Sequence, residues 1–146
     1  MKRLGYIADS DKDERVRDFG TVYTQFEGKP KEAIKFLMKK QEGECINALY
    51  RDDIGYIDII WGDNDPKTNK GKGLKHIIEK HGASINQLGF KVEDFIPIVV
   101  QYGDFNEKES DAYKKVFESK NFRFVVAINE RNNKKKQWLL TSFDIR

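Results

Sequence analysis

The order of apolar and polar residues along the chain predicts a helix followed by extended segments. Ala33, Ile34 and Leu37 recur at the spacing of one helix face, and Pro30 stands where proline is favoured at a helix start. Gly43 follows this stretch and is a candidate C-terminal cap. We therefore predict a helix that begins at Pro30, ends before Gly43 and buries its apolar face in the core.

Alternating apolar and polar residues then predict strands. Residues 46–61 contain one such run and a second run that is rich in strand-forming residues, joined by a polar Arg-Asp-Asp turn, which is typical of a β-hairpin. Three more runs occupy residues 113–119, 121–129 and 137–143, with polar turns between them. Because these three follow one another closely, we expect a consecutive antiparallel meander.

Two segments between the hairpin and the meander favour short helices. Residues 71–82 have glycines near both ends and an apolar stripe at helical spacing. Residues 95–103 follow two acids, carry Pro97 in what would be the first turn and end at Gly103. The second segment is predicted as a short buried helix, although its Val-Val pair also suits a strand.

Helices in the first part and consecutive strands in the last part are typical of an α+β fold. We expect a helical N-terminal half packed on a C-terminal antiparallel β-sheet meander. Residues 1–18 alternate in charge without an apolar period, which predicts a loosely ordered charged arm. Residues 19–146 are expected to form a single domain.

Composition narrows the class of protein. The 146 residues include 27 Lys and Arg against 24 Asp and Glu, and this net charge of +3 is too small to indicate nucleic acid by itself. Cys45 is the single cysteine, which excludes an internal disulfide and a cysteine-based zinc site. The chain has neither a membrane-spanning apolar run nor the apolar core of a secretion signal, so we expect a cytoplasmic protein without a membrane partner.

The basic residues gather at two places. Lys72, Lys75 and Lys80 belong to the glycine-bounded segment, and a second cluster occupies residues 131–136. If the two clusters meet in space, they form one positive surface suited to a polyanion. Solvated lysines in turns are the alternative, especially for the second cluster.

Both histidines of the protein, His76 and His81, lie in residues 71–82. Histidine titrates nearest to neutral pH, so this segment is the first candidate for proton transfer. On an ideal helix, His81 falls on the apolar stripe with Leu74, whereas His76 faces almost the opposite side. We therefore predict an exposed His76 within reach of a ligand, and a partly buried His81 that caps the helix beside Gly82. The spacing of five residues does not suit a two-histidine zinc site.

Three stretches in this order carry a resemblance to a known family. They are residues 55–63, which end in Trp-Gly-Asp, residues 73–82, which hold both histidines, and residues 138–143, which read Trp-Leu-Leu-Thr-Ser-Phe. Together with the Phe-x-Gly-Lys-x-x-x-Ala-Ile pattern in residues 19–43, they resemble the phage-associated barnase–EndoU–colicin–RelE-like nuclease domains. These domains occur in prophage and mobile-element polyproteins of bacteria. The resemblance covers about residues 19–143.

The resemblance implies an α+β fold and metal-independent cleavage of RNA without a cofactor. In that chemistry the ribose 2′-hydroxyl attacks its own phosphate and leaves a 2′,3′-cyclic phosphate and a 5′-hydroxyl, which requires a base, an acid and charge stabilisation. The implied biological role is a phage or mobile-element effector or toxin. Its implied partners are RNA, with tRNA among the candidates, and an immunity or antitoxin protein, and no DNA is expected.

Carried over by position, the resemblance makes His76 the leading general acid or base and His81 the second candidate. Thr141 or Ser142 would donate a hydrogen bond to phosphate, and only one of them can point into the site because they lie on opposite faces of a strand. Arg123 is the candidate charge stabiliser, with an ordinary surface arginine as the alternative. The candidate substrate-binding residues are three lysines, for phosphate, and two aromatics that stack on a base or else belong to the core: Lys72, Lys75, Lys80, Tyr50 and Trp61.

Two other functions remain open at this level. A catalytically inactive relative would bind RNA or protein without cleaving RNA, and a structural domain of a phage polyprotein would do neither. The end groups of RNA exposed to the protein separate these possibilities from a nuclease.

Overall fold

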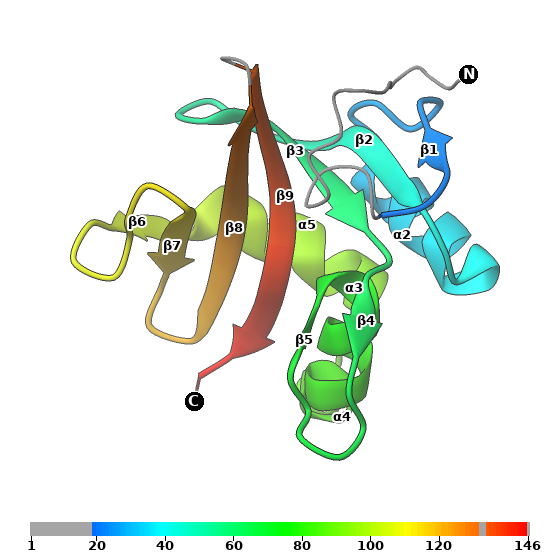
Figure 1. Ribbon diagram of the computed structural model, residues 1–146. Helices are drawn as coiled ribbons and strands as arrows, with labels where there is room; N and C mark the ends of the chain where they lie inside the picture. The colour runs from blue at the N-terminus through cyan, green and yellow to red at the C-terminus, as the bar shows by residue number, and fades with distance from the viewer. Residues whose placement is uncertain (1–18, 132–133, 146) are drawn as a thin grey trace.

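A computed structural model describes residues 19–131 and 134–145 of the chain. The predicted arm at residues 1–18 lies outside the described residues. A seven-stranded mixed sheet has the order β1-β2-β3-β9-β8-β7-β6 and is shown in Figure 1. Its strands are β1 (Val22–Tyr23), β2 (Glu44–Arg51), β3 (Gly55–Ile60), β6 (Asp104–Asn106), β7 (Lys114–Glu118), β8 (Phe122–Arg131) and β9 (Lys134–Asp144).

The predicted α+β class is confirmed, but the division into a helical half and a sheet half is not. The N-terminal strands β1, β2 and β3 belong to the same sheet as the C-terminal meander, because Asp58 of β3 pairs in parallel with Trp138 of β9. The predicted hairpin and the predicted meander are both present, as β2–β3 and β7–β8–β9. The short outer strands β1 and β6 were missed, since two or three residues carry too little alternation to be recognised.

The first helix, α2 (Pro30–Lys40), begins at Pro30 as predicted and buries Ala33, Ile34 and Leu37. Its end differs from the prediction. Gln41, not Gly43, is the C-terminal cap: it adopts the left-handed conformation, at φ 57°, and donates its backbone N–H to the carbonyl of Leu37. This five-to-one bond satisfies one free carbonyl of the last turn.

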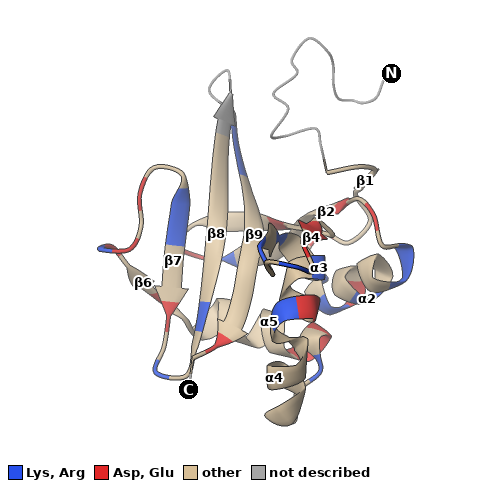
Figure 2. Cartoon of the chain, turned by 60° about the horizontal axis from the view of Figure 1, so that its bottom comes forward, with Lys and Arg blue, Asp and Glu red and all other residues tan. Residues whose placement is uncertain are grey.

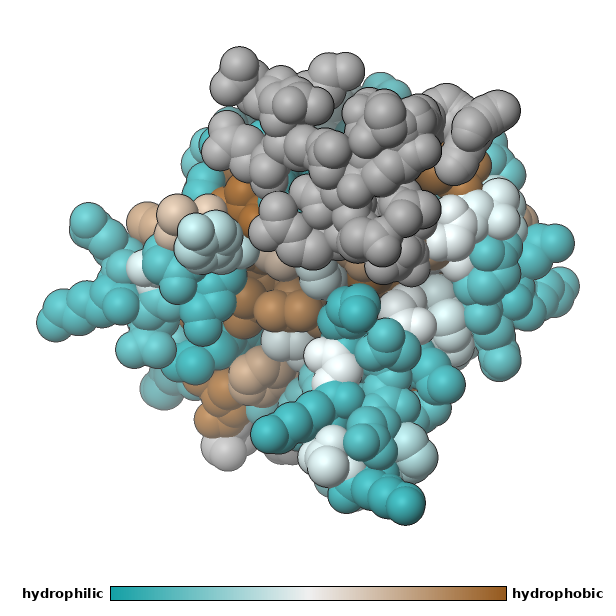
Figure 3. Space-filling model, viewed as in Figure 1, coloured by the Kyte–Doolittle hydropathy of each residue, from teal (hydrophilic) through white to brown (hydrophobic). Residues whose placement is uncertain are grey.

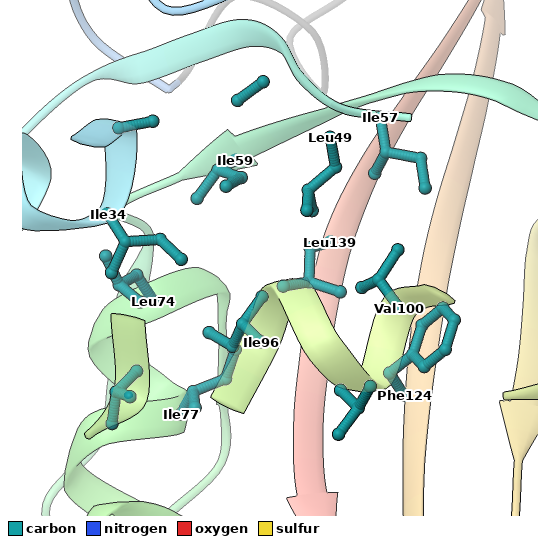
Figure 4. Packing of buried hydrophobic residues seen from close by; sticks show 14 of the residues in the cluster. Ile34, Leu49, Ile57, Ile59, Leu74, Ile77, Ile96, Val100, Phe124 and Leu139 are labelled. Atoms are coloured by element: carbon teal, nitrogen blue, oxygen red, sulfur yellow. The ribbon is translucent and has the colours of Figure 1, made fainter. Parts of the chain in front are cut away.

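The long helix α5 (Val92–Tyr102) crosses the inner face of the sheet and completes the core (Figure 4). It begins three residues before the predicted start, so Pro97 lies inside the helix and not in its first turn. Figure 4 shows Ile96 and Val100 of this helix against Leu139 and Phe124 of the sheet, and all four are almost fully buried. The helix ends at Gly103 as predicted.

A cluster of charges lies within the sheet at the β2–β3–β9 junction. The Lys136 ammonium contacts Glu44 Oε1 and Asp58 Oδ2, each at 2.5 Å, and both carboxylates are almost completely buried. Burial raises the pKa of Glu44, while the two neighbouring carboxylates raise the pKa of Lys136 against the effect of its own burial. The expectation of a second basic surface is therefore wrong for Lys136, which neutralises buried acids and does not face a ligand.

The histidine segment leaves the sheet after β3 and forms a small separate layer. A two-stranded ribbon, β4 (Asp63–Asn64) and β5 (Gly71–Lys72), leads into a continuous helical run along the second half of β9 (Figure 1). This run consists of α3 (Gly73–His76), a π-helical turn η1 (Ile77–His81) and α4 (Gly82–Gln87). Gly82 does not end the helix, as was predicted, because its backbone is helical and the chain continues to Gln87.

Glycine is required where the ribbon meets the helix. Gly73 adopts φ 79°, and a side chain at this position would meet Ile60 Cγ1 at 2.7 Å. Gly62 adopts φ 76°, and a Cβ there would lie 1.9 Å from the carbonyl oxygen of Lys72. Only residues without a Cβ allow this close approach, so these glycines fix the ribbon against the start of the histidine helix.

Candidate active site

The π-helical turn brings the two histidines together. The imidazole centroids of His76 and His81 are 5.6 Å apart and their planes are nearly perpendicular, at 85°. On an α-helix, residues five apart point in divergent directions, whereas an i→i+5 turn places them close to one face. The prediction that the two histidines face opposite sides is therefore wrong, because it assumed α-helical geometry throughout.

His76 is also not exposed, contrary to the prediction. Its side chain is 7% exposed, and its Nδ1 atom lies 2.8 Å from Oδ1 of Asn64. Among the described residues, only the hydroxyls of Thr141 and Ser142 are fully buried without a hydrogen-bond partner. The second ring nitrogen of His76, Nε2, has no partner in the described residues and is not among these enclosed atoms, so it keeps contact with solvent.

Burial lowers the pKa of His76, and the nearby Lys80 ammonium lowers it further, while the Asp63 carboxylate raises it. The imidazole is therefore uncharged at neutral pH. An uncharged imidazole with an accessible Nε2 has the protonation state that a general base requires.

His81 lies between His76 and the last strand. Its ring stacks on Phe143 with a centroid separation of 4.7 Å and an interplanar angle of 19°. Burial lowers the pKa of His81 to about 4, with further lowering by His76 and Lys80, and Asp144 opposes the shift. His81 is thus a second uncharged imidazole, held by an aromatic contact that sequence analysis did not anticipate.

We expect this lowered pKa to make the protein less stable in acid. The unfolded chain binds a proton at His81 near pH 6.5 and the folded chain near pH 4, so this contribution to stability is complete above pH 6.5 and is lost as the pH falls towards 4. His81→Phe keeps a ring against Phe143 and removes the titration. Relative to wild type, its free energy of unfolding should rise by about 3 kcal/mol between pH 7 and pH 4.

Chemical denaturation of both proteins at the two pH values measures this change. Titration of the carboxylates changes the free energy of unfolding of both proteins equally, because wild type and variant share these groups. It therefore does not contribute to the difference between the two proteins. A difference between the two proteins that stays constant with pH would contradict the lowered pKa of His81.

The last strand places Thr141 and Ser142 on different faces, as the sequence requires. Ser142 pairs with Phe124 and is fully buried on the core side of the sheet, so it does not reach the histidines. Thr141 alternates with Phe143 and therefore shares the face on which His81 stacks. Of the two hydroxyl candidates, only Thr141 is on the histidine side.

The helical run that carries His76 and His81 lies beside β9, the strand that carries Thr141 and Phe143 (Figure 1).

Arg123 lies on the same face, directly across the β8–β9 pair from Phe143. Its guanidinium donates from Nε and Nη2 to the same oxygen of Glu118, at 2.9 and 2.6 Å. The ion pair is partly exposed and holds the arginine in place on β8. The other N–H groups of the guanidinium do not bond to Glu118. His81, Phe143 and Arg123 therefore form a row across this face. In Figure 3 the middle of the face is hydrophobic and its two sides are hydrophilic.

The predicted phosphate-binding lysines occupy different surroundings. Lys80 is exposed and close enough to both histidines to lower the pKa of each. Lys72 forms an ion pair with Asp63 at 3.2 Å across the β4–β5 ribbon, and Lys75 is half-buried. Figure 2 shows basic and acidic residues side by side around this helix, so the surface is mixed and not a uniform positive patch.

Of the two aromatic candidates, one is near the histidine layer and the other is not. Trp61 packs against the core and lines a pocket of about 240 Å³ that also contains Lys72. Tyr50 is 45% exposed and stacks edge-on against Tyr56, so it is not a core residue. This pair lies four residues, about 13 Å, along β3 from Ile60, which contacts the start of the histidine helix. Tyr50 is therefore remote from the site.

The described residues contain neither a metal centre nor a membrane-spanning helix. No group of three or more His, Cys, Asp or Glu side chains in the described ranges is arranged to hold a metal ion. Within the same ranges, no helix is both long and apolar enough to cross a membrane.

Comparison with known proteins gives a family assignment. Neither the curated proteins nor the solved structures produced a match. The family described as phage-Barnase-EndoU-ColicinE5/D-RelE like nuclease1 matches residues 48–146, which include the second half of β2, all of β3, the histidine helix and the C-terminal strands. Since this region makes up more than half of the chain and contains the whole candidate site, the protein belongs to this family of nuclease domains.

Proposed function

We propose that this nuclease is a metal-independent endoribonuclease that cleaves RNA by attack of the ribose 2′-hydroxyl on the adjacent phosphate. The observation that carries the proposal is the pair of uncharged imidazoles of His76 and His81, 5.6 Å apart. Cleavage of this kind needs one group to accept a proton and another to donate one, on either side of a single phosphorus atom. Two neighbouring histidines on a partly polar surface suit that requirement.

In the proposed reaction, Nε2 of His76 accepts the proton of the 2′-hydroxyl. The 2′-oxygen forms its bond to phosphorus while the bond from phosphorus to the 5′-oxygen breaks. His81 in its protonated form donates a proton to the departing 5′-oxygen. The products are a 2′,3′-cyclic phosphate and a 5′-hydroxyl, and one proton has moved from His81 to the leaving group and another from the ribose to His76.

The low pKa of His81 is compatible with this role when substrate is bound. An anionic phosphodiester beside the imidazole favours its charged form and so raises its pKa. The His81 ring is held against Phe143 and beside Asp144, which already favours the charged form. His81 is thus uncharged in the free protein and becomes a proton donor as the phosphate arrives.

The remaining candidates supply charge and hydrogen bonds to the phosphate. Arg123 is held on the same face by Glu118 and offers unused N–H donors, and Lys80 provides a cation beside both histidines. The Thr141 hydroxyl has no hydrogen-bond partner among the described residues but is fully buried, so it is a weaker candidate for a phosphate donor than Arg123 or Lys80. Donors fixed in place before the charge develops are the most effective stabilisers of a phosphorane.

The end groups of cleaved RNA test this proposal. We expect purified protein in the presence of a chelator to convert bulk RNA into fragments ending in 2′,3′-cyclic phosphate and beginning with 5′-hydroxyl. An oligonucleotide with a single ribose should be cut only after that ribose, and the all-deoxy version should remain intact because it has no 2′-hydroxyl. Absence of cleavage by folded protein, or 3′-hydroxyl and 5′-phosphate ends, would exclude the proposed chemistry. Salt-sensitive RNA binding without cleavage would instead indicate an inactive binding module.

A further inference from the structure

The Asn64 side chain lies at the centre of a hydrogen-bonded chain that reaches His76. Its Oδ1 atom is 2.8 Å from Nδ1 of His76, and its Nδ2 atom donates to Oε1 of Glu79 at 3.1 Å and to Oδ1 of Asn69 at 3.2 Å. The Asn64 side chain is itself buried, at 7% exposure. Every polar atom of this amide is therefore used.

The partners of the amide determine its orientation. A carboxylate such as Glu79 only accepts hydrogen bonds, so the NH₂ group of Asn64 must face it. The carbonyl oxygen of Asn64 then faces His76, and because this oxygen is also an acceptor only, Nδ1 of His76 must carry the proton. In the uncharged ring the other nitrogen, Nε2, is then the one that can accept a proton.

We propose that Asn64 is a positioning residue that selects the Nδ1-protonated tautomer of His76, and that Glu79 holds Asn64 in the required orientation. This inference rests on the proposed role of His76 as the general base. It assigns a specific role to the β4–β5 ribbon, which carries Asn64.

The ribbon is built so that the Asn64 side chain can lie across it. A Cβ on Gly71, the residue paired with Asn64 in β5, would be 2.8 Å from Asn64 Oδ1 and 2.7 Å from its Cα. The same Cβ would be 2.2 Å from the carbonyl oxygen of Asp63. A larger residue at position 71 would thus displace the carbonyl that faces His76, which explains a glycine in a strand position where it is otherwise unfavourable.

The choice of an amide and not a carboxylate also has a consequence for the base. An aspartate at position 64 could hold the same tautomer, but its charge would favour the imidazolium and raise the pKa of His76. An amide fixes the ring without charging it. Asn64 therefore keeps the Nε2 lone pair available at neutral pH, which a charged partner would oppose.

Nitrogen NMR of the His76 ring tests the assignment independently of activity. We expect the wild-type ring above its pKa to show a protonated Nδ1 and an unprotonated Nε2. Asn64→Ala should convert the ring to a mixture of tautomers or to the Nε2-protonated form. Asn64→Asp combined with Glu79→Gln preserves the acceptor towards His76 and supplies a donor towards position 64, so it serves if the alanine variant does not fold. This double variant should keep the Nδ1 proton and raise the pKa of His76. Asn86→Ala, an exposed amide on α4, is the matched control and should change neither property.

The kinetic consequence is measured on the same variants. Asn64→Ala should lower kcat by about 10- to 100-fold with little change in KM, as for other residues that orient a functional imidazole. Asn64→Asp combined with Glu79→Gln should move the acid limb of the kcat/KM profile to higher pH. A wild-type ring protonated on Nε2, or an unchanged tautomer in Asn64→Ala, would overturn the inference. If the tautomer results hold but the wild-type protein leaves RNA intact, the proposed function fails while the control of the His76 tautomer by Asn64 stands.

Discussion

Replacing Lys136 with methionine is expected to lower the free energy of unfolding by about 3–5 kcal/mol, the usual cost of leaving a buried charge without its partner. The Lys136 ammonium is the shared partner of two almost fully buried carboxylates, Glu44 and Asp58, at 2.5 Å from each. Methionine fills a similar volume but leaves both carboxylates facing one another in an apolar setting. Urea denaturation at pH 7, with the midpoint and slope compared with those of wild type, measures the loss.

A charge-free version of the same cluster provides the control. Glu44→Gln, Asp58→Asn and Lys136→Met together remove all three charges, and this triple variant should recover most of the stability lost by Lys136→Met alone. The single variant should also recover part of its stability as the pH falls, because burial already raises the pKa of Glu44 and protonation removes the unpaired charge. Equal destabilisation of the single and triple variants would show that the loss comes from packing and not from charge.

Local sequence patterns were sufficient to predict the elements whose stabilisation is mainly local or periodic. Pro30 and the spacing of Ala33, Ile34 and Leu37 gave the start and the buried face of α2 correctly. The alternation in β2 and the strand-forming residues of β3, β8 and β9 were equally informative, although the middle parts of β3 and β8 are buried on both faces. In contrast, the parallel pairing of β3 with β9 joins Asp58 to Trp138, and nothing near either residue indicates that partner.

The candidate site was predicted in part, and its main error has a single physical cause. The helical wheel assumes about 100° per residue, but η1 accommodates its residues in a wider turn. This one irregular turn reverses the predicted orientation of His76 and places it beside His81. Sequence analysis favoured His76 because it expected this histidine to be exposed, and the structure buries it.

The positions missed by sequence analysis are those that depend on long-range contacts. Asn64 follows the Trp-Gly-Asp stretch directly, but its pairing with His76 becomes visible only when the β4–β5 ribbon folds over the helix. Phe143 appeared in the sequence as one apolar residue of a strand, and its stacking on His81 depends on how the helical run lies beside β9. The position of Gly71 could have been predicted to be close to another group, because a glycine within a short strand indicates such a close approach.

If His76 is the general base, His76→Ala should reduce kcat/KM for RNA cleavage by about 10²- to 10⁴-fold, the contribution usual for a positioned acid or base. His76→Gln is the more informative variant, because a side-chain amide can still hydrogen-bond to Asn64 Oδ1 but cannot accept the proton of the 2′-hydroxyl. We expect it to bind RNA nearly as well as wild type and to cleave as slowly as the alanine variant. Initial rates on a single-ribose oligonucleotide, together with fluorescence anisotropy for binding, separate the two effects.

The pH dependence adds a second signature of the same residue. Burial and Lys80 lower the pKa of His76, so this base loses its proton at a pH below that of a free histidine. The rate with RNA bound should rise with pH along an acid limb as His76 loses its proton, and fall again as His81, the proposed acid, loses its own. This acid limb should be absent from the residual activity of His76→Gln. Lys31→Ala, which breaks a surface ion pair with Asp94 remote from the site, is the control for altered charge and should leave both rate and profile unchanged. Full activity in His76→Gln, or an acid limb that persists in it, would assign the base to another group, and His81 would then be the first to test.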